Sequence, residues 1–360
     1  MKNIFFFAFV LILAACGGTQ KMLRPPAYIT CVTADVETPA VRAAADADAA
    51  DDPAVWVHPQ DPARSVIVGT VKRYGLEVYN LQGQVLHSIQ IGNPNNVDIQ
   101  YGFTLSNGQV IDLVVCSDRS TNEILVFQIS PSDQSLRLLN GGRIKSALGE
   151  VYGICLYKSL KTKQFYVFLN GKDGSVEQYE LLPSGMDGVR GELRRKIKLK
   201  TQPEGMVADH QAGIVYFGEE DRGIWRVAAD PGQPATPTLI PNTGAANPHL
   251  AYDIEGLAIF PLSDTTGYLL ASSQGNNTYA VFDRQDNRYL GSFCIGDGAI
   301  DGTFDTDGIE ACARPLGPAF PKGLFVAQDG ANTDAAGQPL PQNFKLVAWE
   351  KIAAVIATFK

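Results

Sequence analysis

Six apolar, strand-like runs recur along the chain at a nearly regular spacing. Most are followed by a polar loop and a second run with period-2 alternation, the pattern of a strand with one face buried. No long stretch of the sequence shows a sustained helical period, and Gly (35) and Pro (21) are plentiful. These features predict an all-β protein built from repeated antiparallel meanders. The apolar runs begin about 45 to 56 residues apart, near Val66, Ile111, Phe165, Ile214, Tyr268 and Leu324.

Six units of about fifty residues predict a six-bladed β-propeller, assigned to residues 46–360. An elongated β-solenoid would use shorter repeats, and a two-sheet sandwich would not need six similar units. We expect segment 53–57 to close the ring by pairing with the last unit, because a propeller otherwise leaves sheet edges open. The tail 350–359 is expected to form a short helix on the outside.

The N-terminal segment indicates export. A lysine precedes an apolar run over residues 4–13, which is too short for a membrane span, and Leu13-Ala14-Ala15-Cys16 resembles a bacterial lipobox. We therefore predict a lipoprotein-type signal over 1–15, lipidation of Cys16 and a tether over 16–45. The protein would then be anchored to the cell envelope, at the outer membrane in a Gram-negative cell because Gly17 follows the cysteine. The alternative is a plain secretory signal, which would leave the protein periplasmic or secreted.

Export permits disulfides, but five cysteines remain besides Cys16, so at least one is free or pairs between chains. Cys116 and Cys155 lie in apolar runs and are expected in the core. A Cys294–Cys312 bridge is one alternative, and the pairing that includes Cys31 stays open. No pair has CxxC spacing and the chain has four His, which argues against a zinc site.

The formal net charge is −8, so nucleic acid is a poor partner, and we expect membrane contact only through the lipid anchor. Abundant Asp and Glu favour hard cations such as calcium, which takes six to eight oxygen ligands.

Acidic and basic residues gather in the loops that recur from unit to unit. Any single Asp-Gly pair is more often a turn than a ligand, but carboxylates at equivalent positions of successive units are hard to explain as turns alone. The basic residues Lys72, Arg73, Arg119 and Lys172 all come from the first three units. The acidic loops, several of them flanked by glycine, include Asp51-Asp52-Pro53, Glu204-Gly205, Glu219-Glu220-Asp221, Asp253-Ile254-Glu255-Gly256 and Asp305-Thr306-Asp307-Gly308.

Such a face suits phosphate chemistry. Calcium ions neutralise carboxylates and present positive charge, while Lys and Arg hold phosphate oxygens. A metal-bound water of lowered pKa attacks phosphorus without a Ser, Cys or His nucleophile. The sequence has no GxSxG elbow, HExxH motif or P-loop.

The motifs, in this order, resemble those of the β-propeller phytases, the alkaline calcium-dependent 3-phytases of bacteria. The likeness covers about residues 51–349. It is carried by DDPAVWVHP (51–59), NNVDIQY (95–101), EVYG (150–153), GKDGSVEQYEL (171–181), PEGM (203–206), GEEDRGIW (218–225), DIEGLAIF (253–260), GYLLASSQGNNTYAVF (267–282), DTDGIE (305–310), GLFVAQDG (323–330) and QNFKLVAWE (342–350).

The resemblance implies a six-bladed propeller that acts, we expect as a monomer, on phytate (myo-inositol hexakisphosphate) and other inositol phosphates as calcium complexes. Direct attack of a metal-bridging water would release inorganic phosphate and lower inositol phosphates. Several calcium ions would be bound, catalytic and structural. By motif, the catalytic calcium cluster would be held by Asp51, Glu204, Glu220, Asp253, Glu255 and Asp307. Substrate phosphates would contact Lys72, Arg73, Arg119, Tyr152 and Lys172. Stabilising calcium sites would use Asp52 and Asp98, and Asp301 and Asp329.

Two departures from the family pattern stand out. Lys72-Arg73 replaces a lysine pair, which keeps the charge but adds a bidentate grip on phosphate. Ala331 stands where relatives often have Glu, which removes a carboxylate near Asp329. Two other functions remain as alternatives: another calcium-dependent propeller hydrolase, lactonase-like, which would not need the basic residues, and a non-catalytic lipoprotein that binds calcium and a polyanion.

Overall fold

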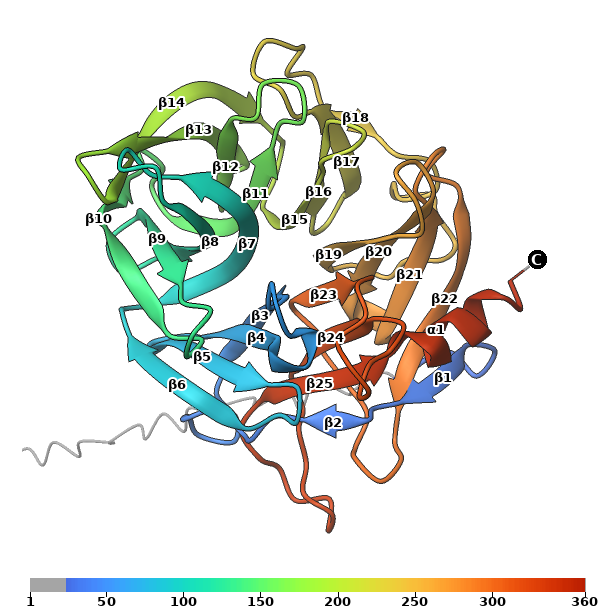
Figure 1. The fold of residues 1–360 in the computed structure, drawn as a ribbon. Helices are drawn as coiled ribbons and strands as arrows, with labels where there is room; N and C mark the ends of the chain where they lie inside the picture. Colours follow the sequence, from blue (N-terminus) through green and yellow to red (C-terminus); the bar gives the residue numbers. More distant parts are fainter. Residues whose placement is uncertain (1–23, 360) are drawn as a thin grey trace, which may run out of the picture.

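The computed structural model describes residues 24–359, which form an all-β, propeller-like ring of sheets around a central axis (Figure 1). Within each group, antiparallel strands follow one another outward from the axis. The first sheet contains β3 (Ala50–Trp56), β4 (Val66–Val71), β5 (Gly75–Asn80) and β6 (Val85–Gln90). The next sheet has eight strands, β7 (Pro94–Thr104), β8 (Val110–Asp118), β9 (Glu123–Ile129), β10 (Leu136–Lys145), β11 (Val151–Lys158), β12 (Phe165–Gly171), β13 (Ser175–Ser184) and β14 (Gly188–Lys198).

Three further sheets complete the ring. One contains β15 (Pro203–Asp209), β16 (Ile214–Glu219), β17 (Gly223–Ala228) and β18 (Thr238–Leu239). Another contains β19 (Ile254–Pro261), β20 (Gly267–Ser273), β21 (Thr278–Asp283), β22 (Tyr289–Gly296) and β1 (Thr30–Thr33). The last contains β23 (Ile309–Cys312), β24 (Leu324–Asp329), β25 (Asn343–Ala348) and β2 (Val36–Glu37).

The six predicted apolar runs are the strands next to the innermost ones, namely β4, β8, β12, β16, β20 and β24. Their side chains are buried on both faces because each sheet packs between two neighbours; every residue of β4 and of β24 is buried. This is why these strands are nearly continuous apolar runs instead of alternating ones. Cys116 in β8 and Cys155 in β11 are both buried, as expected.

The ring is closed by β2, not by segment 53–57. Pro53–Trp56 belongs to β3, the innermost strand of the first sheet, while Val36 and Glu37 pair antiparallel with Leu346 and Lys345 of β25. The last sheet has only three strands of its own, so a strand from the N-terminal side fills its outer position. The seam between the last and first sheets is apolar, with the Tyr79 and Phe344 rings edge to face at 6.0 Å.

A second N-terminal strand, β1, adds to the outside of the preceding sheet. It runs parallel to β22, and Cys31 lies opposite Cys294 and forms a disulfide with it. The Cys294–Cys312 alternative is therefore wrong, and Cys312 is a free, buried thiol. Both β1 and β2 lie in the segment that the sequence predicts to be a tether.

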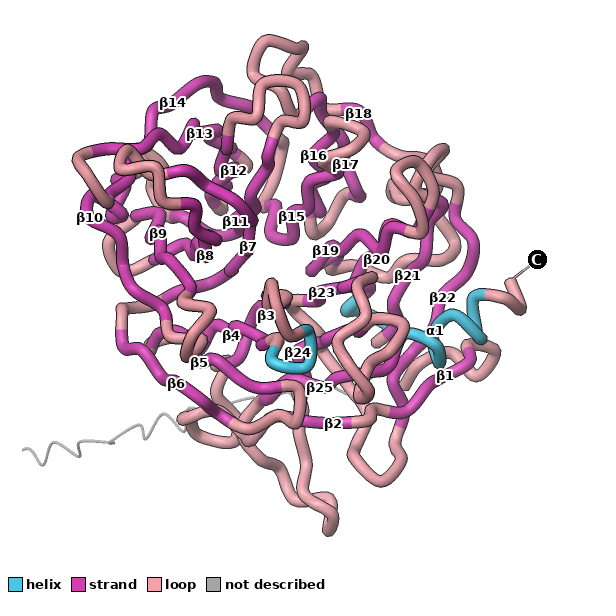
Figure 2. The backbone as a smooth tube through the Cα atoms, viewed as in Figure 1, coloured by secondary structure: helices cyan, strands magenta, loops and turns pink. Residues whose placement is uncertain are grey.

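Helical structure is confined to short pieces (Figure 2). The predicted C-terminal helix is α1 (Trp349–Ile356), which packs against β1, β22 and β25, and the two 3₁₀ turns are η1 (Pro62–Arg64) and η2 (Gln274–Asn276). Within residues 24–359, no helix has the length and apolarity that a membrane crossing requires. The predicted signal over 1–15 and the lipidation site Cys16 lie outside the described residues.

A buried ion pair fastens the end of β15 to the turn after β21. The Arg284 guanidinium donates to both carboxylate oxygens of Asp209, each at 2.6 Å, and the side chains are 4% and 1% exposed. Burial alone would raise the pKa of Asp209, but the hydrogen bonds and charge of Arg284, together with hydrogen bonds from the Ala212 and Gln211 backbone, outweigh burial and lower the pKa. The pair is thus a stabilising contact of the native state above the ordinary pKa of Asp.

We predict that Arg284→Met lowers the free energy of unfolding by about 3–5 kcal/mol at neutral pH, because it leaves the Asp209 carboxylate buried and unpaired. Since the folded pKa of Asp209 is lowered, the pair's contribution is complete above pH ~4 and is lost as pH falls through the folded pKa. Urea unfolding at several pH values measures both effects. The matched control Arg288→Met removes an exposed partner 3.8 Å from Asp286 and should cost less than about 1 kcal/mol; equal losses would contradict the assignment.

Candidate active site

One irregularity recurs at the same place in successive innermost strands. The register of β3, β7, β11, β15 and β19 shifts by a β-bulge against the neighbouring strand, which leaves two residues unpaired. In the sixth unit, Asp307-Gly308 directly precedes β23. Each bulge turns one polar side chain toward the same end of the axis. We call these six residues the bulge ring: Asp51, Asn95, Tyr152, Glu204, Glu255 and Asp307.

Glycine follows four of the six ring residues because the next unit's backbone leaves no room for a side chain. A Cβ at Gly153 would lie 1.9 Å from the carbonyl oxygen of Glu204, and one at Gly205 would lie 2.1 Å from that of Glu255. Gly256 N donates to Asp307 O (2.8 Å), and Gly308 N donates to Asp51 O (3.0 Å). The glycines therefore let ring residues from successive units approach one another closely.

Most of the predicted acidic residues meet here. One carboxylate oxygen from each of Glu204, Glu220 and Glu255 lies within 4.8 Å of the others. Glu220 is held by the turn between β16 and β17, where its carboxylate accepts a hydrogen bond from Gln202. Asp253 lies exposed at the start of β19 and interacts electrostatically with Glu204.

Lys72 lies among the acidic residues, apart from the other predicted phosphate contacts. Its ammonium is 2.6 Å from Asp51 Oδ2, 2.7 Å from Asp48 Oδ1 and 3.5 Å from Asp307 Oδ2. Burial lowers the pKa of Lys72, but the neighbouring carboxylates, Asp51 above all, outweigh it and raise the pKa. Lys72 thus remains charged and neutralises part of the cluster.

Burial and mutual repulsion make this cluster reluctant to ionise. Burial raises the pKa of Asp51 to about 7, against the pull of Lys72, and raises that of Glu220 to about 7. It also raises the pKa values of Glu255 and Asp307 well above the ordinary range, and Glu204 adds to the rise at Glu255. Carboxylates in this state favour a cation that would neutralise them.

The cationic side of the site is built around the ring of Tyr152. Arg119 and Lys172 lie over this ring, at 5.3 Å and 4.5 Å from its centroid. Both also face Glu150, whose carboxylate accepts from Arg119 Nη2 at 2.8 Å and lies 3.6 Å from Lys172 Nζ. Arg73 is exposed in the turn before β5, with a positive φ of 63°.

Several buried polar atoms of the site have no hydrogen-bond partner among residues 24–359. They include the acceptors Asp51 Oδ1 and Glu255 Oε2 on one side, and the donor Arg119 Nε on the other. Unpaired buried polar groups are costly, so their presence points to ligands. The acceptors call for a cation and the donor for an anion.

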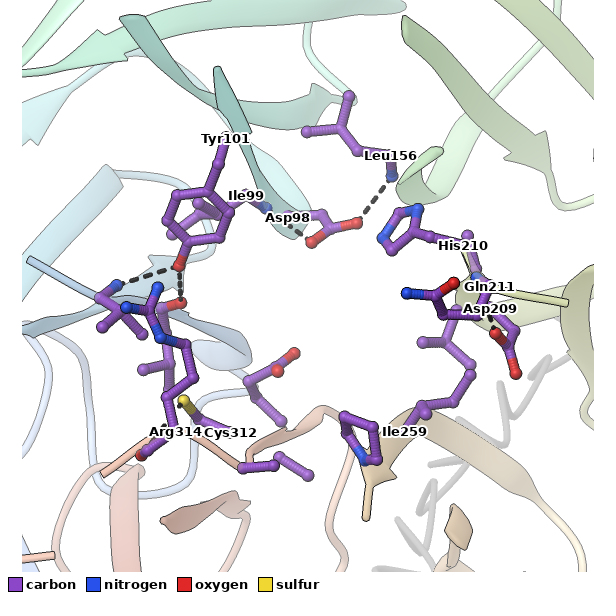
Figure 3. Close-up of a pocket in the computed structure, with 18 of the residues that line it drawn as sticks. Asp98, Ile99, Tyr101, Leu156, Asp209, His210, Gln211, Ile259, Cys312 and Arg314 are labelled. Atoms are coloured by element: carbon purple, nitrogen blue, oxygen red, sulfur yellow. Dashed lines mark hydrogen bonds between the residues drawn. The ribbon is translucent and has the colours of Figure 1, made fainter. Parts of the chain in front are cut away.

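Asp52 and Asp98 lie further along the axis. Asp52 Oδ2 accepts from Val97 N (2.9 Å), and Asp98 accepts from Ile99 N and Leu156 N (2.6 Å each). Glu310 joins them, and burial raises the pKa of Asp98 to about 6 and that of Glu310 to about 8. Beyond them, at the opposite end of the axis from the bulge ring, a cavity of about 490 Å³ is lined by residues such as Tyr101, His210 and Arg314 (Figure 3).

Asp301, between β22 and β23, and Asp329, at the end of β24, form a separate group beside the last sheet. Together with Glu37 they surround the wholly buried Lys345 ammonium, which is 2.5 Å from Glu37, 3.5 Å from Asp329 and also paired with Asp301. Burial raises the pKa of Asp329 to about 7.

Sequence reasoning missed several residues of the site. Asn95, Glu150 and Gln274 lie within the motifs over 95–101, 150–153 and 267–282, but the resemblance assigns them no role. In the structure, Gln274 donates to Asp307 Oδ1 at 2.8 Å. Asn95 could have been found by aligning the bulge dipeptides, since it holds the position of Asp51 and Glu204. Glu310 could have been found in the same way, since it stands three residues after Asp307, as Asp98 stands three residues after Asn95.

A propeller-like ring whose axis ends in buried carboxylates beside stacked cations is a candidate hydrolase site, and comparison with known proteins gives the family. The family model described as Phytase matches residues 8–359. The 3-phytase of Bacillus subtilis (strain 168) is 47% identical over 328 residues, which cover 89% of this chain and 84% of that protein. The chain therefore belongs to the phytase family, whose members are phosphoric monoester hydrolases.

Among solved structures, a chain of a nidogen–laminin complex is similar with a TM-score of 0.44 and 13% identity. The match covers 67% of this chain and 78% of that one. Likeness at this level carries no argument about function.

We predict that Gly205→Ala destabilises the fold by about 1–3 kcal/mol, because the new Cβ would overlap the carbonyl of Glu255 and push two ring positions apart. Thermal or urea unfolding measures the loss. Gly232→Ala is the matched control, since a Cβ there meets nothing within 4 Å, and should change stability by less than about 1 kcal/mol. If both variants lose the same stability, the close approach of the ring backbones does not constrain the fold.

Proposed function

We propose that the protein is a calcium-dependent phytase that hydrolyses phosphomonoesters of phytate, bound as its calcium complex, to inorganic phosphate and lower inositol phosphates. Family membership supports the reaction. The observation that carries the proposal for this site is the pairing of unpartnered buried acceptors, Asp51 Oδ1 and Glu255 Oε2, with the unpartnered buried donor Arg119 Nε. A calcium ion satisfies the acceptors and a phosphate oxygen satisfies the donor.

We also propose that the ring has six blades. The eight-stranded sheet consists of two four-stranded meanders that share one bridging pair, Asn140 with Gly188. Divided there, the sheets give six groups, and an apolar cluster lies between each group and the next.

The residues at the bulge ring fit calcium, which prefers several carboxylate oxygens. Those that would hold it are Asp51, Glu204, Glu220, Asp253, Glu255 and Asp307. When bound there, calcium supplies positive charge for the transferring phosphoryl group and lowers the pKa of water that attacks it. Glu204 is central to the set, because it interacts electrostatically with Asp51, Glu220, Asp253, Glu255 and Asp307.

The cationic side would bind the substrate phosphates. Arg119 would donate from Nε to a phosphate oxygen. Lys172 would bind a second phosphate oxygen in place of the Glu150 carboxylate, which lies 3.6 Å away. The Tyr152 ring keeps both cations oriented, Arg73 would reach outlying phosphates from the rim, and Lys72 would balance charge between Asp51 and the substrate. These contacts would hold the phosphoryl group between the two sides, where negative charge develops.

Asp52 and Asp98 are proposed for a stabilising calcium along the axis. Asp301 and Asp329 are proposed for a further stabilising calcium. They would bind it more weakly, because the Lys345 ammonium already brings positive charge to them. Ala331 supplies no carboxylate, which would also lower the calcium affinity of this site.

We further propose that the protein is exported by a signal over residues 1–15 and carries lipid on Cys16. A tether would connect this anchor to the propeller-like domain, which extends to residue 360 and is proposed to be a monomer. The lipobox sequence supports this proposal. Cys16→Ala should release the protein from the membrane fraction of the producing cell; a protein that still sediments with membranes would refute the anchor.

We predict that Glu204→Gln lowers phosphate release from calcium phytate at least about a hundredfold, more than loss of an outer-shell contact costs. A chelator should abolish activity in the wild-type protein and calcium should restore it. Phosphate release, with melting temperature as the fold control, measures the effect. Activity that survives the chelator would refute the calcium mechanism.

We predict that calcium raises the melting temperature and that the gain grows with pH. Because the folded pKa values of Asp51 and Glu220 are raised to about 7, the calcium-free protein binds more protons than the unfolded chain. Its stability therefore falls as pH rises from ~4 to about 7. Melting curves in calcium and in chelator across this range test the prediction, and identical curves would contradict it.

A further inference from the structure

Asn95 is the ring residue that lies between the acidic and the cationic sides. Its side chain is wholly buried. Asn95 Nδ2 donates to Glu204 Oε1 at 2.7 Å and to Asn96 Oδ1 at 2.9 Å, while Asn95 Oδ1 accepts from Arg119 Nη1 at 3.3 Å. One amide group therefore contacts the central carboxylate of the proposed calcium cluster and the principal guanidinium of the phosphate-binding side.

The chemistry of the two partners explains why an amide stands here. A carboxylate can only accept and a guanidinium can only donate, so a bridge between them needs an acceptor and a donor in one side chain. The same requirement fixes the orientation of the amide, because the flipped form would place NH₂ against the guanidinium. An aspartate would keep the contact to Arg119 but repel Glu204, and an aliphatic residue would leave both partners unmatched.

We propose that Asn95 is a positioning residue that couples the cation-binding carboxylates to the phosphate-binding arginine. By holding Glu204 and Arg119 in a common hydrogen-bond network, it sets the separation between the metal cluster and the phosphate. The inference rests on the proposed function, because it assumes that Glu204 binds the cation and that Arg119 binds the anion.

The contacts of Arg119 show what the bridge controls. Nη2 donates to Glu150, whose side chain is half exposed, and the guanidinium lies over Tyr152, so two of its contacts can yield to a ligand. The contact of Nη1 with the buried Asn95 is the fixed one, and it determines where the unpaired Nε points. Loss of Asn95 would free the guanidinium to turn and would remove a donor from Glu204.

The test measures binding of the two ligand types separately, in the full-length protein. Isothermal titration calorimetry gives the dissociation constant of calcium, and then that of inorganic phosphate at saturating calcium. The variants are Asn95→Ala, Arg119→Ala, their combination and Glu204→Gln. Asn107→Ala, in the exposed turn between β7 and β8 at the opposite end of the axis, is the matched control and should leave both constants unchanged.

We expect Asn95→Ala to weaken both calcium and phosphate binding, each about tenfold, the effect of losing a hydrogen bond to a charged group. Arg119→Ala should weaken phosphate binding alone. The double variant should bind phosphate no more weakly than Arg119→Ala, because Asn95 acts on phosphate through Arg119. Asn95→Asp keeps the acceptor for Arg119 and should lose less phosphate affinity than Asn95→Ala. The aspartate variant also provides the test if the alanine variant fails to fold.

Three results would overturn the inference: unchanged constants in Asn95→Ala, losses that multiply in the double variant, or equal phosphate losses in Asn95→Asp and Asn95→Ala. Failure of the proposed function is a different result. In that case the wild-type protein would release no phosphate from calcium phytate, while the calorimetric pattern of the variants could still hold.

Discussion

The close approach of neighbouring backbones at the bulge ring is the constraint on which the site depends. Innermost strands of successive units meet there with no space for a Cβ between Gly205 and the carbonyl of Glu255, or between Gly153 and that of Glu204. This contact brings side chains from distant parts of the sequence within a few ångströms. It also forces like charges together; Lys72 neutralises part of this charge, and burial raises the pKa values of Glu220 and Glu255, which favours their protonated forms.

The two halves of the site follow from the order of the chain. Arg119, Tyr152 and Lys172 come from the second and third units, and Glu204, Glu220 and Glu255 from the fourth and fifth, so the circular arrangement brings the two groups to the same end of the axis. Asn95 belongs to an early unit but reaches across to Glu204, and Lys72 reaches back to Asp307 beside the closing seam. Asn95 therefore joins the acidic and cationic halves, whereas Lys72 links acidic residues of the first and last units.

Much of this arrangement could be predicted from sequence, because repetition carries the information. The apolar runs marked one strand of every unit, and carboxylates beside glycine marked most of the bulge ring. What escaped prediction lacked such a signal. The closing strand β2 is two residues long and has no periodicity, and Cys31 pairs with a cysteine 263 residues away. Asn95 carries no charge, and its role appears only when its two partners are seen together.

The direction of β1 has a consequence for how the molecule is displayed. This strand runs parallel to β22, which climbs from the turn near Arg288 toward the end of the axis that bears the bulge ring. The polypeptide therefore enters the ring from the opposite end, the end with the cavity, and the disulfide at Cys31 fixes this entry. The carboxylates of the bulge ring are therefore displayed at one end of the axis, and the entering chain lies at the other.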